Sequence, residues 1–195
     1  MAFIDADEFW TPQSFDDPQS ALRENLQIPD SAGIVLNWRI FGSSGHTTKK
    51  KGLVVERFTK AAPDNHKFNR HIKTIARVDR IARMNIHHAV PKLGYRFHND
   101  RGVAQKFEND STHGPITSGE VFSEQRINHY VIKSKEEFVK KKQSRGYAGG
   151  KTEEKRPGSF FVLHDINDET FAFPDWFILK SKSILSDLRA RIGDD

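Results

Sequence analysis

The sequence predicts an α/β protein in which a mixed sheet is flanked by helices. Residues 33–41 are a largely apolar run with several β-branched side chains, which is typical of a buried strand. Residues 127–132 predict a second strand, which leads directly into a helix start at Ser134. Residues 175–192 have the spacing of an amphipathic helix. A chain of 195 residues is long enough for one sizeable core and short for two.

The composition excludes several classes of protein. Aromatic residues make up 11% of the chain, which argues against a disordered protein. No apolar run approaches the roughly 18 residues of a membrane span, and the N-terminus has no signal-peptide pattern, so we expect a cytoplasmic chain that allows peripheral membrane association. The absence of cysteine excludes disulfides and thiolate metal sites, and it fits a reducing compartment.

The charge is basic, with a net value of +5 and a sequence pI near 9.4. Lysine and arginine are concentrated in residues 49–106 and 133–156. A basic surface suits any polyanion, including nucleic acid, anionic lipid and a diphosphate-bearing substrate, and does not choose among them. The run Lys49-Lys50-Lys51 is either a solvated connector or a contact to a negative ligand.

An acidic cluster near the N-terminus is the main candidate for chemistry. Asp5, Asp7 and Glu8 are crowded into four residues between apolar ones. Carboxylates this close repel each other unless a cation lies between them, and Mg²⁺ or Mn²⁺ prefers such oxygen ligands. If residues 2–4 form a short buried strand, Asp5 and Asp7 project to one side of its end. The alternative is a solvated turn with one of the aspartates capping a helix.

The remaining elements follow from periodicity and from helix and turn signals. In order, we expect a helix at 18–27, a strand at 33–41, a loop at 42–51, a strand or helix start at 53–58, a turn at 60–70, strands at 71–78 and 85–90, irregular structure or a hairpin at 92–119, a strand at 127–132, a helix at 134–142, a linker at 147–158, a strand at 160–163 and a helix at 175–192.

Three further places carry side chains that suit a site. His129 lies near the end of a predicted strand, and Lys133 precedes a capped helix whose amides favour phosphate. Glu56 is a carboxylate in an apolar segment, which is either a general base or a partner of Arg57. Of the neighbours His87 and His88, at most one can face a shared site, because adjacent strand residues point to opposite faces.

The order of the motifs resembles glycosyltransferase family 92 and related family 2 enzymes. The motifs are DADEF at 5–9, WRIFGSSGH at 38–46, VERFT at 55–59, IKTI at 72–75, HH at 87–88 and INHYVIKS at 127–134, followed by Glu137, Phe138 and Lys141. Their shared order over residues 3–146 makes the resemblance fairly specific, and residues 147–195 lie outside it.

The resemblance implies a GT-A fold, which is a Rossmann-like mixed sheet, and an inverting transfer of a sugar from a nucleotide diphosphate to an acceptor hydroxyl. It places Asp5 and Asp7 in the DxD motif that holds Mn²⁺ or Mg²⁺ on the donor diphosphate, most simply that of a UDP-sugar. His129 becomes a ligand of the metal or diphosphate, and Lys133 a partner of the leaving phosphate.

The resemblance also implies an acceptor site and a base. Trp38, Phe41, Gly45 and His46 would form part of a pocket for a glycan or polysaccharide. Glu56 is the candidate catalytic base, with Glu120 and Asp110 as alternatives.

The chain departs from the family in one respect. The DxD motif normally follows a nucleotide-binding half, whereas here it begins at residue 5. We therefore expect residues 1–146 to correspond to the C-terminal part of a GT-A domain and residues 147–195 to a linker and helical tail. The activity of this short chain is left open.

Two other functions fit parts of the sequence. A non-catalytic polyanion-binding module would explain the basic charge, although the basic and aromatic interleaving of a nucleic-acid fold is missing and no nucleic-acid partner is expected. A metal-dependent phosphoesterase would use the same Asp, Glu and His ligands.

Overall fold

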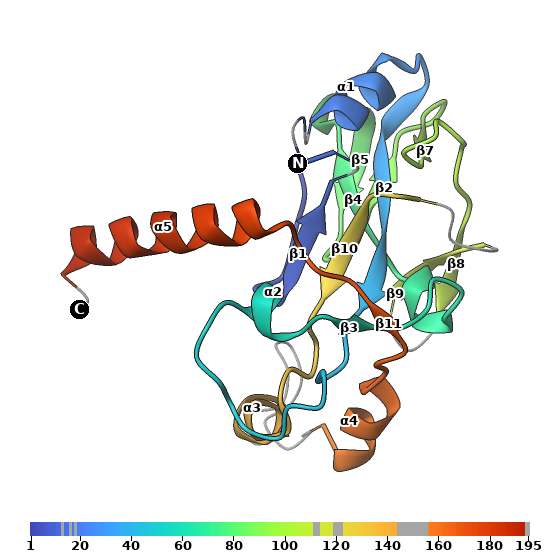
Figure 1. The fold of residues 1–195 in the computed structure, drawn as a ribbon. Helices are drawn as coiled ribbons and strands as arrows, with labels where there is room; N and C mark the ends of the chain where they lie inside the picture. Colours follow the sequence, from blue (N-terminus) through green and yellow to red (C-terminus); the bar gives the residue numbers. More distant parts are fainter. Residues whose placement is uncertain are drawn as a thin grey trace. The chain divides into compact units, whose positions relative to one another are not determined.

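The computed structural model describes residues 1–12, 14, 15, 17, 19–110, 114–118, 123–143 and 156–193. The chain divides into two compact units that alternate along the sequence: Met1–Ile40 with Pro63–His129, and Phe41–Ala62 with Tyr130–Asp195. Figure 1 shows the main sheet in the first unit and mostly helices in the second. The predicted α/β class, with a mixed sheet and flanking helices, is confirmed. The predicted boundary between residues 146 and 147 lies outside the described residues.

The sheet of the first unit is mixed. Its strands are β1 (Glu8–Thr11), β10 (Arg126–His129), β2 (Ser31–Ile40) and β4 (Ile72–Ala76) in that order, and β7 (Arg96–His98) also pairs with β2. Strands β10 and β7 run parallel to β2, whereas β1 is antiparallel to β10 and β4 is antiparallel to β2. Figure 1 shows β2 as the long strand between its shorter neighbours.

Strand β2 is the centre of this unit, as its apolar sequence predicts. Nine of its ten residues are buried, and Ala32 and Val35 belong to a core cluster. The other buried members of this cluster are Ile72, Ala76, Ile81, Ala89 and Phe97. Gly33 has a φ of +139°, and a Cβ there would lie 2.1 Å from the carbonyl oxygen of Ile75. Only glycine therefore lets β4 approach β2 this closely.

Shorter elements complete the first unit. They are the helix α1 (Ser20–Gln27), the 3₁₀ turns η1 (Lys67–Arg70) and η2 (Val78–Arg80), the hairpin of β5 (Ile81–Met84) and β6 (Ala89–Pro91), and the hairpin of β8 (Phe107–Asp110) and β9 (Gly114–Thr117). The predicted helix at 18–27 is confirmed from Ser20 onward, while Pro18 lies outside the described residues. The hairpin allowed within 92–119 is the β8–β9 pair.

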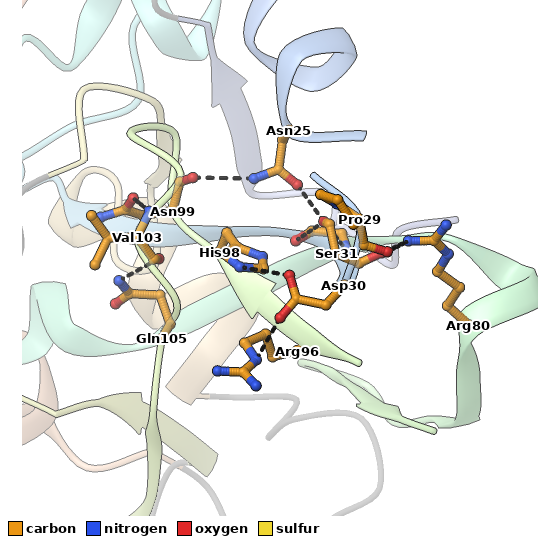
Figure 2. Close-up of polar contacts among 11 residues, drawn as sticks. Asn25, Pro29, Asp30, Ser31, Arg80, Arg96, His98, Asn99, Val103 and Gln105 are labelled. Atoms are coloured by element: carbon orange, nitrogen blue, oxygen red, sulfur yellow. Dashed lines mark hydrogen bonds and ion pairs between the residues drawn. The ribbon is translucent and has the colours of Figure 1, made fainter. Parts of the chain in front are cut away.

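A polar network fixes the start of β2, and Figure 2 shows it in detail. Asp30 Oδ2 forms an ion pair with Arg96 Nε at 2.7 Å, and Asp30 Oδ1 lies 3.5 Å from His98 Nε2. Burial lowers the pKa of His98, so this imidazole favours its neutral form. The Ser31 hydroxyl donates to Asn25, whose amide group donates to the Asn99 carbonyl. The network ties α1 and β7 to the first residues of β2.

The second unit is built from short elements and one long helix. These elements are α2 (Val54–Arg57), the strand pair β3 (Lys60–Ala61) and β11 (Glu169–Thr170), α3 (Lys135–Phe138) continued by a π-helix (Val139–Gln143), α4 (Gly158–His164) and α5 (Asp175–Ile192). The helix starts predicted at Ser134 and Asp175 are confirmed, and the 53–58 segment takes the helical alternative. Residues 60–70, predicted as a turn, contain β3 and η1.

Two predicted strands are wrong. Residues 160–163 belong to helix α4, which begins after Pro157 and places Phe160 and Phe161 against Phe138 at ring-centre distances of 6.1 and 5.4 Å. Four consecutive apolar residues do not distinguish a strand from a buried helix turn, and the packing on α3 decides for the helix.

Residues 2–4 form no strand either, and Phe3 and Ile4 are 48% and 43% exposed. The strand begins at Glu8, the last of the three carboxylates, because the segment from Asp5 to Glu8 closes a tight turn before the aromatic pair Phe9-Trp10. The strand predicted at 85–90 is shortened to Ala89–Pro91 for a similar reason, since the Asn85 amide donates to the His88 carbonyl at 2.9 Å and closes the β5–β6 turn.

Among the described residues, no helix is both long enough and apolar enough to span a membrane.

Candidate functional site

The acidic turn at the start of β1 is closed by its own hydrogen bonds. The Glu8 amide donates to the Asp5 carbonyl at 3.0 Å, and the Asp5 amide donates to the Glu8 carboxylate at 2.9 Å. The Glu8 side chain is fully buried, while that of Asp5 is 53% exposed. The three carboxylates are therefore in different environments although they are neighbours in the sequence.

Lys73 of β4 supplies a positive charge to this turn. Its Nζ lies 3.0 Å from Asp5 Oδ2 and 3.2 Å from Glu8 Oε2, and it donates to the Ile86 carbonyl at 3.3 Å. The Lys73 side chain is only 2% exposed. This role was not predicted from the sequence, although one signal was present: a single lysine inside a buried, otherwise mostly apolar strand requires a partner.

Burial and Lys73 have opposite effects on the ionisation of Glu8. Burial raises the pKa of Glu8, while the Asp5 amide and Lys73 act in the opposite direction. Within the described part of the chain, Glu8 Oε1 has no hydrogen-bond partner. A buried carboxylate with one engaged oxygen depends strongly on its single cation for stability.

Asp7 faces His129, the last residue of β10. Asp7 Oδ1 and His129 Nε2 are 3.9 Å apart, and their side chains are 15% and 11% exposed. The pairing of β1 with β10 explains this contact, because Glu8 lies opposite His129 in the antiparallel register and Asp7 immediately precedes Glu8. A carboxylate oxygen and an imidazole nitrogen are both ligands of divalent cations.

The fit of this pair to a metal is partial. Asp5, the third predicted ligand, is in contact with Lys73 instead. The described residues contain no group of three or more His, Asp or Glu side chains that could hold a metal ion. The described residues would thus supply two ligands, Asp7 and His129, and a bound nucleotide diphosphate would add oxygen ligands.

Trp38 supports His129 from within the sheet. The Trp38 ring lies 4.3 Å from the His129 ring and stacks on His71 at 4.8 Å with an angle of 15° between the planes. His87 meets the same indole edge-on at 6.0 Å, and burial lowers the pKa of His87. Trp38 is 9% exposed, so its ring is mostly covered. In this position it fixes the orientation of imidazoles, and the acceptor role expected for it stays a prediction.

His46, Glu56 and Lys133 belong to the second unit, whereas Asp5, Asp7, Trp38 and His129 belong to the first. His46 Nε2 lies 2.9 Å from the Arg57 carbonyl oxygen, which anchors the loop after β2. Lys133 has a left-handed backbone, with φ of +58°.

Glu56 lies in surroundings that disfavour a general base. Its carboxylate is 38% exposed and accepts a hydrogen bond from Lys182 of α5 at 2.6 Å. This bond lowers the pKa of Glu56, whereas a base at neutral pH benefits from a raised value. The base role of Glu56 stays a prediction. Of the two alternatives, Glu120 lies outside the described residues, and Asp110 lies in β8.

The helix start beside Lys133 is capped from within the protein. The Ser134 hydroxyl accepts from the Glu137 amide at 3.3 Å, and the Ser134 amide donates to the Glu137 carboxylate at 3.4 Å, as the predicted capping box requires. The amides of Lys135 and Glu136 donate to the carbonyls of His46 and Thr47. Because these amides are engaged, a phosphate role for this segment rests on the Lys133 side chain.

Arg57 and Glu137 form a buried ion pair that the sequence analysis did not single out. Two guanidinium nitrogens of Arg57 contact the two carboxylate oxygens of Glu137 at 2.9 and 3.0 Å. Burial alone would raise the pKa of Glu137, but the hydrogen bonds from Arg57 and Ser134 outweigh it and lower the pKa to about 2. This pair links α2 to α3.

Comparison of the chain with known protein families, curated proteins and solved structures gave no match.

Proposed function

We propose that the chain is a metal-dependent glycosyltransferase that moves a sugar from a nucleotide-diphosphate donor to a glycan or polysaccharide acceptor. The observation that carries the proposal is the approach of Asp7 to His129 within the first unit. These two residues belong to separate motifs of the resemblance to glycosyltransferase family 92, and they are 122 positions apart in the chain. Their meeting is what a shared metal-binding role requires.

The chemistry assigned to the chain follows from these side chains. Asp7 and His129 would hold Mn²⁺ or Mg²⁺, and the donor diphosphate would complete the coordination. When bound, the cation would offset the negative charge that develops on the diphosphate as the sugar–phosphate bond breaks. Lys133 would add a positive charge for the leaving phosphate.

The contacts of Lys73 suggest separate roles for Asp5, Asp7 and Glu8. Because Lys73 already forms ion pairs with Asp5 and Glu8, we assign them to shaping the turn and Asp7 to the metal. Trp38 and its histidine neighbours hold the His129 ring in place. The donor is taken to be a UDP-sugar, as the resemblance implies.

Calorimetric titration of the purified chain with UDP, with and without Mn²⁺, tests the proposal. We expect binding that requires Mn²⁺, loss of Mn²⁺ binding in Asp7→Asn, and a much smaller change in Asp5→Asn. Asp79→Asn, an exposed aspartate in the same unit, is the matched control. An unchanged Mn²⁺ affinity in Asp7→Asn would overturn the metal assignment.

A second variant tests the phosphate contact separately. Lys133→Ala should weaken UDP binding more than Mn²⁺ binding, because the lysine is assigned to the diphosphate and not to the cation. Equal losses of both affinities would contradict that role.

A further inference from the structure

The second unit contains a cavity of about 560 Å³ that is lined almost entirely by cationic side chains. The lining residues are Lys49, Lys50, Lys51, Gly52, Arg57 and Arg189. A volume of this size is in the range of small-molecule sites, which is about 300–1,000 Å³. A cavity whose walls carry one sign of charge concentrates ligands of the opposite sign.

The lysine run is held in place at both ends. At one end the Lys49 amide donates to the Glu136 carboxylate at 2.7 Å, and at the other Gly52 takes a φ of +115°. A Cβ at Gly52 would lie 3.0 Å from Glu56 Oε2, so glycine lets the loop turn closely over α2. The backbone of the run is therefore bonded to α3 at Lys49 and turns over α2 at Gly52, and its lysines line the cavity.

Helix α5 supplies the opposite wall. Lys182 bonds to Glu56 at 2.6 Å, and Arg189 lies seven residues later, on the same side of the helix. A neighbouring groove of about 440 Å³ runs between Leu53 and this side of α5, and it is lined by Lys182, Leu185 and Arg189 among others.

The nearby carboxylates are already engaged. Glu137 neutralises Arg57, Glu56 pairs with Lys182, and Glu136 pairs with Lys140. Among the described residues, Lys50, Lys51 and Arg189 make no ion pair, so no described carboxylate offsets their charges.

Arg57 gives a second and independent indication of a ligand. Its side chain is 8% exposed, and its Nε has no hydrogen-bond partner in the part of the chain that the structure describes. Leaving a buried donor of a charged group without a hydrogen-bond partner destabilises a protein. An oxyanion in the cavity that Arg57 lines would satisfy it.

We propose that this cavity binds the acidic groups of an anionic oligosaccharide, meaning one that carries sulfate, phosphate or carboxylate. The described lining residues include no aromatic side chain, whereas binding of single-stranded nucleic acid normally uses aromatic residues to stack the bases. The choice of a saccharide as the carrier of the charge rests on the proposed function.

The test is titration of the whole chain, at low salt, with a sulfated tetrasaccharide and with its unsulfated counterpart. We expect binding of the sulfated form only, weakened about tenfold or more in Lys50→Ala/Lys51→Ala and in Arg189→Ala, because partly exposed charges act strongly at low salt. The matched control is Lys92→Ala/Lys180→Ala, which removes two exposed lysines that do not line the cavity.

Several outcomes would overturn the proposal. They are equal binding of both tetrasaccharides, an equal loss in the control variant, and no binding by the unchanged chain. Binding of inorganic pyrophosphate without binding of the sulfated tetrasaccharide would assign the cavity to a small phosphate ligand instead. The tetrasaccharide titration is run without UDP and Mn²⁺, so a failure of UDP and Mn²⁺ binding is distinguishable from a failure of this proposal.

Discussion

Replacing Lys73 by Met should destabilise the protein strongly, because it leaves Glu8 buried without its cation. The Glu8 side chain is fully buried, and the Lys73 side chain is 2% exposed, with 3.2 Å between Nζ and Oε2. At this distance the attraction is about 5 kcal/mol for an effective dielectric constant of about 20. Removing one partner of a buried ion pair typically costs about 3–5 kcal/mol, and we expect a loss in this range. Asp5 adds little to it because its side chain is 53% exposed.

Urea unfolding followed by tryptophan fluorescence measures this loss. The double variant Lys73→Met/Glu8→Met should recover most of the stability, because it replaces the whole pair by apolar groups of similar size. Lys140→Met, which removes an exposed lysine paired with Glu136, should change the free energy of unfolding by less than about 1 kcal/mol. A loss below about 1 kcal/mol in Lys73→Met, or no recovery in the double variant, would refute the reasoning.

Three further predictions concern the fold. The pKa of Glu137 is lowered from 4.5 to about 2, so the stability that its ionised carboxylate contributes is present above pH 4.5 and is lost as the pH falls toward 2. The thermal midpoint of Glu137→Gln should therefore approach that of the unchanged chain as the pH is lowered. A difference between the two midpoints that does not narrow would contradict this. Gly33→Ala should lower the free energy of unfolding by about 3 kcal/mol or more, because a Cβ there meets the backbone of β4. Gly94→Ala, where φ is +87° and the space is open, should lower it by about 1–2 kcal/mol. Equal losses in urea unfolding would be inconsistent with the contact at Gly33. Ser134→Ala should cost about 1 kcal/mol through loss of the helix cap, and unchanged stability would show that the cap is dispensable.

The parts of the fold that could be predicted from the sequence depend on local patterns. The run at 33–41 predicted β2 because a strand buried on both faces has a near-continuous apolar sequence. The Ser134 capping box and helix α5 were predicted for similar local reasons. The segment at 160–163 was mispredicted because its conformation depends on packing against Phe138, which is not a local property.

The candidate site was predictable in its residue types and not in its contacts. The cluster of Asp5, Asp7 and Glu8 marked the region, but Lys73 is 65 positions or more away and was not singled out. The approach of His129 depends on the register between β1 and β10, which the sequence of neither strand determines alone.

The register also explains why three adjacent carboxylates can have separate roles. Strand alternation would place Asp5 and Asp7 on one side, but the tight turn closed by Glu8 breaks that alternation before the strand begins. Glu8 is then directed inward to Lys73, and Asp7 is left beside His129. With this division of roles, Glu8→Gln should lower the free energy of unfolding and retain Mn²⁺ affinity. Asp7→Asn should lose Mn²⁺ affinity and retain the free energy of unfolding. Equal effects of both variants on both measurements would show that the turn acts as one undivided acidic site.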